Sequence, residues 1–136
     1  MKAVVKWANE GLFIGYSESG HTLLMDTDGG KLAPTPLENV LISLGGCSSV
    51  DVVSILKKSK QVVTTCEVEI EGLRVDSVPK LISDIHLKFI ITGNGIKDKH
   101  VERAVSLSAD KYCSVALMLN KNVNITHSFE VISEEV

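Results

Sequence analysis

The feature that most constrains this chain is a stretch from residue 36 to about residue 58 that predicts a long, nearly uncharged helix. Thr35 is placed to be its N-cap, a proline suits the first helical position, and Glu38 follows Thr35 by three residues, which is the pattern of a capping box. Between residues 40 and 56 the only charged residue is Asp51. A helix that is apolar around most of its circumference has to be buried on most sides. Because a chain of 136 residues has few elements left to surround it, we expect a second subunit to supply part of the cover.

Strand patterns flank this helix on both sides. Three short runs precede it and are separated by short turns with glycine, which favours a meander. The expected strands are residues 3–7, 12–16, 21–26, 66–75, 85–91 and 123–132, and the expected later helices are residues 101–112 and 114–119. The order β-β-β-α-β-β-α-α-β predicts an α+β fold. The chain contains no linker and no internal repeat, which predicts one domain over residues 1–136.

The composition narrows the class of function. Hydrophobic residues make up 44% of the chain, which indicates a packed core. The formal charge of -3 offers no basic surface, so we expect neither nucleic acid nor a membrane as a partner. We see no signal peptide and no apolar run of spanning length, which makes the cytoplasm the default location. The three cysteines form no CxxC pair and no Cys/His cluster, so neither a zinc site nor another cofactor is expected.

Cys47 lies inside the long helix, directly after Gly45 and Gly46. Each glycine in a helix interior costs about 1 kcal/mol relative to alanine, so we expect either the close approach of another helix or a small cleft beside the thiol. Ser43 and Asp51 each lie one turn from Cys47 and extend a polar seam through an otherwise apolar helix. Such a seam indicates a pocket or a line of hydrogen bonds between helices.

Cys113 lies where one predicted helix ends and the next begins, and the N-terminus of a helix stabilises a thiolate. Two thiols can complete a two-electron cycle, in which one becomes a sulfenic acid and the other condenses with it to a disulfide. The alternative is that these are inert core residues, because free cysteines are among the most buried residue types. Cys66, at the start of a predicted strand, fits that alternative best.

Other polar residues have structural interpretations. Glu67, Glu69 and Glu71 alternate along one strand and predict a solvated face. His86 is expected to face solvent, and His127 is expected to be a core residue on the apolar face of the last strand. In the strand that contains the glutamates, the apolar residues move from even-numbered positions before Gly72 to odd-numbered positions after it, which predicts a β-bulge there.

Two motifs surround the paired cysteines. The first runs from APTPLE at residues 33–38 into LGGCSSVDVV at residues 44–53, and the second is SADKYCSVA at residues 108–116. With these motifs the chain closely resembles the OsmC/Ohr family of osmotically induced and organic-hydroperoxide-resistance proteins, and within it the YhfA-like branch. The resemblance covers nearly the whole chain and implies an OsmC-like fold in an interwoven homodimer, with sheets around central helices. It also implies reduction of organic hydroperoxides, with Cys47 as the peroxidatic and Cys113 as the resolving cysteine.

Two positions depart from the pattern of the family's peroxidases. Those enzymes carry a glutamate ten residues before the first cysteine, where this chain has Leu37, and Glu38 comes one residue later. On a straight helix of about 3.6 residues per turn, Glu38 should face away from Cys47. The peroxidases also use an N-terminal arginine to stabilise the thiolate, and this chain has none before Arg74.

The predicted function is therefore a thiol-dependent, peroxidase-like redox protein that works through Cys47 and Cys113. Glu38, Asp51 and Ser43 are lesser candidates for supporting residues, and Asp51 would oppose a thiolate at Cys47. The expected substrate is a small apolar hydroperoxide or another electrophile, and the expected reductant is a dithiol. The alternative is a dimeric binding or thiol-sensing module without peroxidase turnover.

Overall fold

The computed structural model describes residues 1–27 and 29–134. The chain forms two compact units, Met1–Ile42 and Ser43–Val136, and their border falls inside helix α1 (Pro36–Lys58). The two units are described separately. The prediction of a single domain stays a prediction.

The first unit is a three-stranded antiparallel meander of β1 (Ala3–Asn9), β2 (Leu12–Ser17) and β3 (Thr22–Asp26), as predicted. The capping box is also confirmed. The Thr35 backbone N–H donates to Glu38 Oε1 at 2.9 Å, and the Glu38 N–H donates to Thr35 Oγ1 at 3.2 Å. These two bonds satisfy free donors at the start of α1 and explain why the helix begins there.

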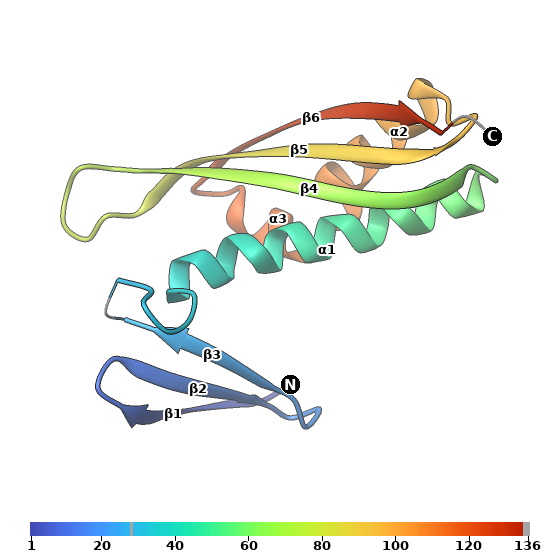
Figure 1. Ribbon diagram of the computed structural model, residues 1–136. Coiled ribbons are helices and arrows are strands. Elements are labelled where there is room, and N and C mark those ends of the chain that lie inside the picture. Colours follow the sequence, from blue (N-terminus) through green and yellow to red (C-terminus); the bar gives the residue numbers. More distant parts are fainter. Residues whose placement is uncertain (28, 135–136) are drawn as a thin grey trace. The chain divides into compact units, whose positions relative to one another are not determined.

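The second unit has a sheet in the order β4-β5-β6, formed by β4 (Val62–Arg74), β5 (Ile82–Asn94) and β6 (Asn124–Ser133). Strands β4 and β5 are antiparallel, whereas β5 and β6 are parallel. A parallel pair needs a crossover connection, which here consists of α2 (Asp98–Leu107), a π-helical turn η1 (Ser108–Tyr112) and α3 (Ser114–Leu119) (Figure 1). The predicted element order is thus confirmed, with η1 continuing α2.

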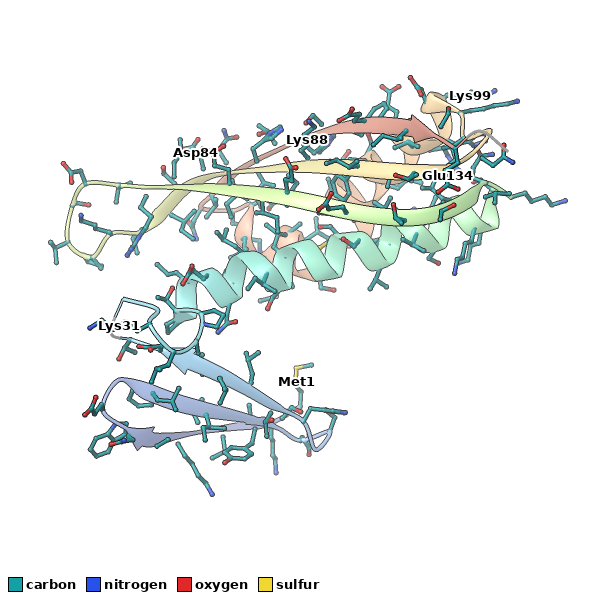
Figure 2. The ribbon with its side chains drawn as sticks, viewed as in Figure 1. Met1, Lys31, Asp84, Lys88, Lys99 and Glu134 are labelled. Carbon is teal, nitrogen blue, oxygen red and sulfur yellow. The ribbon has the colours of Figure 1, made fainter. Side chains whose placement is uncertain are left out.

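The two faces of this sheet differ sharply. Its inner face carries a fully buried row on β5, made of Ile85, Leu87, Phe89 and Ile91. The helices supply the other half of the core through Leu44, Val52, Leu56, Val101, Ala104 and Val105. Asp84 and Lys88 point away from the helices (Figure 2), and the pairing places Glu69 beside Lys88 and Glu71 beside His86. The expected solvated face is confirmed.

Two details differ from expectation. Gly72 pairs regularly with Ile85, and the register shifts fall instead between Val63 and Thr65 and between Leu73 and Arg74. The predicted bulge at Gly72 is therefore wrong in position. Leu73 is 58% exposed, so the apolar residue after Gly72 does not turn to the buried face of the strand. Helix α1 is also long and apolar enough, by length and composition alone, to cross a membrane, which we did not expect. A core helix passes the same test, and within the second unit one face of α1 packs into the core.

Candidate functional site

Helix α1 brings Cys47 to the border of the core. Its buried ridge repeats every four residues, as Leu44, Ser48, Val52 and Leu56, and Cys47 lies half-buried beside it. A Cβ at Gly45 would overlap the side chain of Ile70, whereas no atom lies within 4 Å of the place a Cβ would occupy at Gly46. The first glycine thus serves close packing against strand β4 rather than against a helix. The second leaves open space next to the thiol.

Cys113 is the N-cap of α3, as its predicted position between two helices required. The side chain is completely buried. Its sulfur accepts two hydrogen bonds, one from the hydroxyl of Ser48 at 3.4 Å and one from the backbone N–H of Ala116 at 3.4 Å. The thiol is therefore fixed in place by donors from two helices.

The structure brings Cys47 and Cys113 together as free thiols that interact directly. Burial raises the pKa of Cys113, and the hydrogen bond and charge of the neighbouring Cys47 raise it further. The hydrogen bonds from Ser48 and Ala116 act in the opposite direction. The net direction is upward, so Cys113 stays protonated at neutral pH.

A line of polar groups connects this thiol to Asp51. The Ser108 hydroxyl donates to Asp51 Oδ2 at 3.0 Å and lies 3.4 Å from the carbonyl oxygen of Ser48. Asp51 is therefore bound to η1 across the helix interface, which agrees with the predicted line of hydrogen bonds between helices. Its predicted effect on a thiolate at Cys47 stays a prediction.

The other supporting candidates lie elsewhere. The Glu38 carboxylate is bound to the helix start through the Thr35 N–H. Ser43 is exposed on α1 and does not join the hydrogen bonds around Cys113. Sequence reasoning missed Ser48 and Ser108. A signal for Ser48 was present, because it interrupts an otherwise apolar ridge at four-residue spacing.

A small cavity of about 90 Å³ adjoins Ser48. Its apolar lining includes part of the buried row on β5, and its polar groups come from α1, η1, the residue after α3 and strand β6. The lining residues are Ser48, Leu87, Phe89, Val105, Ser108, Ala109, Asp110, Ala116, Asn120, Ile125 and His127. His127 points to the inner side, opposite Leu87, but it is exposed, so the prediction of a core histidine is wrong. Strand β6 lies at the edge of the sheet, and this inner-facing side chain is exposed there.

Cys66 lies half-buried on β4, and burial raises its pKa while a hydrogen bond with Ser49 opposes that shift. Among the described residues, no group of His, Cys, Asp and Glu side chains is arranged to hold a metal ion.

The chain has an α+β fold with this strand order, and its long glycine-containing helix places one thiol against a second at the start of α3. These features are those of an OsmC-like protein. The sequence model of the OsmC-like protein family matches residues 28–128, and the chain belongs to that family. It is 55% identical over 133 residues to Protein YhfA of Escherichia coli strain K12, covering 98% of this chain and 99% of that one.

Solved structures agree with this assignment. The crystal structure of a hypothetical protein from Aquifex aeolicus has a TM-score of 0.89 at 32% identity, covering 98% of this chain and 97% of that one. The crystal structure of an organic hydroperoxide resistance protein OsmC from Legionella pneumophila, described as a predicted redox protein, has a TM-score of 0.71 over 96% of this chain and 98% of that one. At 15% identity, the second comparison shows a shared fold alone.

Proposed function

We propose that this protein is a thiol-dependent, peroxidase-like redox protein in which Cys47 attacks an organic hydroperoxide and Cys113 resolves the product. The observation that carries the proposal is the contact between a half-buried thiol and a fully buried one. The more accessible sulfur is suited to meet a substrate. The buried sulfur of Cys113 is suited to resolve the oxidised Cys47 that it contacts.

The steps balance with these two residues and one external reductant. The Cys47 thiolate attacks one oxygen of the hydroperoxide, the O–O bond breaks, and the alkoxide leaves and takes a proton as an alcohol. Cys47 is then a sulfenic acid. The Cys113 sulfur attacks the Cys47 sulfur, a disulfide forms, and the oxygen leaves as water. A dithiol returns both cysteines to thiols and is itself oxidised to a disulfide.

The surroundings favour a small apolar substrate. Helix α1 as a whole is rich in Val, Leu and Ile, and within four residues of Cys47 it carries Leu44 and Val50. Gly46 leaves free space at the neighbouring position. An apolar hydroperoxide would bury its carbon chain against such a helix, whereas a charged one would lose hydration there.

We further propose that the protein acts as a homodimer in the cytoplasm. Val50 on α1 and Trp7 on β1 are each 69% exposed in the single chain, and a partner subunit would cover such side chains. The free thiols fit a reducing compartment. Size-exclusion chromatography with light scattering tests the dimer, and a monomer at micromolar concentration would contradict it.

A second candidate function is a thiol-sensing or binding module without turnover. Two observations favour it: Glu38 is bound within the helix cap, and the two donors to the Cys113 sulfur are both neutral. Such a protein would react once with an electrophile and would not recycle efficiently.

The deciding experiment mixes reduced protein with cumene hydroperoxide and maps the remaining thiols by mass spectrometry. We expect loss of the thiols at Cys47 and Cys113, retention at Cys66, and loss of the disulfide in Cys47→Ser and Cys113→Ser. Cys66→Ser is the matched control and should behave like wild type. Repeated turnover with dithiothreitol supports the peroxidase, and stoichiometric oxidation supports the thiol sensor. Unchanged thiols at both Cys47 and Cys113 would contradict both functions.

A further inference from the structure

We propose that Ser48 is a positioning residue for Cys113. The Ser48 hydroxyl holds the Cys113 sulfur in place and stabilises the Cys113 thiolate that is released when a Cys47–Cys113 disulfide is reduced. This inference rests on the proposed function, because it concerns the return half of the same cycle. It assigns a role to a residue outside the cysteine pair.

The direction of the Ser48 hydroxyl is the first observation. A serine inside a helix commonly donates to the carbonyl four residues earlier, and the neighbouring Ser49 does so, to the Gly45 oxygen at 2.6 Å. Ser48 instead donates across the interface to the Cys113 sulfur. It is 2% exposed and occupies a place in the ridge where an apolar residue would pack. A thiol is a weak acceptor and a thiolate a strong one, so this donor gains most when Cys113 is charged.

The second observation is that Ser108 fixes both partners. Its hydroxyl donates to Asp51 at 3.0 Å, on the helix that carries Ser48, and lies 3.4 Å from the carbonyl oxygen of Ser48. Its own carbonyl accepts the backbone N–H of Cys113 at 2.8 Å. The same residue therefore contacts the helix of the donor and the backbone of the acceptor, which limits their separation. Such fixed donors require no rearrangement when charge develops.

The redox step shows where the donor acts. A thiolate of a dithiol reductant attacks the Cys47 sulfur, forming a mixed disulfide, and the bond to Cys113 breaks with its electron pair on the Cys113 sulfur. The second thiol of the reductant then attacks the mixed disulfide and releases Cys47. Both leaving thiolates take up protons, and the reductant loses two electrons.

Cys113 leaves from a buried position that water does not reach. Burial raises the pKa of this thiol, and the Ser48 and Ala116 hydrogen bonds oppose that rise. Because a better-stabilised thiolate leaves faster, removing the Ser48 hydroxyl should slow reduction of the disulfide.

The test uses the full chain, with the disulfide formed by diamide so that no peroxide chemistry is needed. Ser48→Thr and Ser48→Val are the matched pair, since they have the same shape and differ in the hydroxyl, and Ser48 lines a cavity with room for a methyl group. Ser48→Ala is the third variant, and Ser49→Ala is the control for loss of a helical serine.

We expect dithiothreitol to reduce the valine and alanine variants about tenfold more slowly, the factor that suits one hydrogen bond to a charged group. The Ser48→Thr and Ser49→Ala variants should be reduced at rates close to that of wild type. In a Cys47→Ser background, alkylation of Cys113 should move to higher pH in the valine variant but not in the threonine variant. If Ser48 had a purely structural role, its substitution would lower stability without separating the threonine variant from the valine variant in reduction rate or in the pH of alkylation.

Equal reduction rates and equal pH profiles for the threonine and valine variants would overturn the proposal. If diamide forms the disulfide but cumene hydroperoxide does not, the proposed function falls and the Ser48 comparison still decides this inference. If diamide forms no Cys47–Cys113 disulfide, both fall.

Discussion

The hydroxyl of Ser108 donates to Oδ2 of Asp51 at 3.0 Å and thereby ties the π-helical turn to α1. Ser108 is buried and Asp51 is half-buried, so the bond joins a desolvated hydroxyl to a carboxylate at the border of the core. Single π-helical turns are frequent at functional sites, and this one ends directly before the Cys113 cap. The bond sets how the two thiol-bearing segments meet.

We expect Ser108→Ala to lower the free energy of unfolding by about 1–3 kcal/mol, because it leaves the Asp51 carboxylate partly buried without this donor. Urea unfolding measures the effect. Ser54→Ala, an exposed serine on the same helix as Asp51, is the control and should change stability by less than about 0.5 kcal/mol. Equal effects in the two variants would contradict the importance of this bond.

The two helical glycines should respond differently. Gly45→Ala brings a Cβ onto the terminal methyl of Ile70, which has to rotate away, and this cost offsets the gain in helix propensity, so stability should stay within about 1 kcal/mol of wild type. Gly46→Ala meets open space and should stabilise α1 by about 0.5–1 kcal/mol. Thermal unfolding of the reduced proteins distinguishes them. A loss of stability in both would show that the space beside Gly46 is filled in the assembled protein.

The raised pKa of Cys113 predicts an alkaline loss of stability. A thiol whose pKa is higher in the folded than in the unfolded state adds stability below the ordinary value of 9.0, and that stability is lost as the pH rises through the folded pKa. Unfolding free energies measured from pH 7 to above pH 9 in a Cys66→Ser background should therefore fall. Adding Cys113→Ser should flatten this decline. Parallel pH curves for the two proteins would contradict a shift at Cys113.

Glu38 should act through the helix cap and not through chemistry. We expect Glu38→Ala to lower the free energy of unfolding by about 0.5–2 kcal/mol, as cap losses do, while the rate of Cys47 oxidation by cumene hydroperoxide stays unchanged. Glu69→Ala on the solvated sheet face controls for removal of a negative charge. A large drop in oxidation rate with Glu38→Ala alone would make Glu38 part of the reaction.

Local signals in the sequence predicted the elements well. The capping box placed the start of α1, and the junction of two helical patterns placed Cys113 at a helix N-terminus, because both depend on residues close in sequence. The hydrogen bond from Ser48 to Cys113 was beyond such reasoning. It joins residues 65 positions apart, and only the packing of α1 against α3 determines it.

The errors have similar causes. His127 has the alternation of a core residue, but β6 is an edge strand, and neither strand order nor parallel pairing with β5 can be read from alternation. The register shift near Gly72 falls one step later, at Leu73 and Arg74, because cross-strand pairing with β5 decides it.

The distance along the chain between the two thiols has a mechanical consequence. A bond between Cys47 on α1 and Cys113 at the start of α3 would enclose β4, β5 and α2 in one covalent loop. Closing a long loop restricts the unfolded chain, so the oxidised form should melt at a higher temperature than the reduced form. The redox state of the protein would then be readable as a melting temperature, without any chemical label.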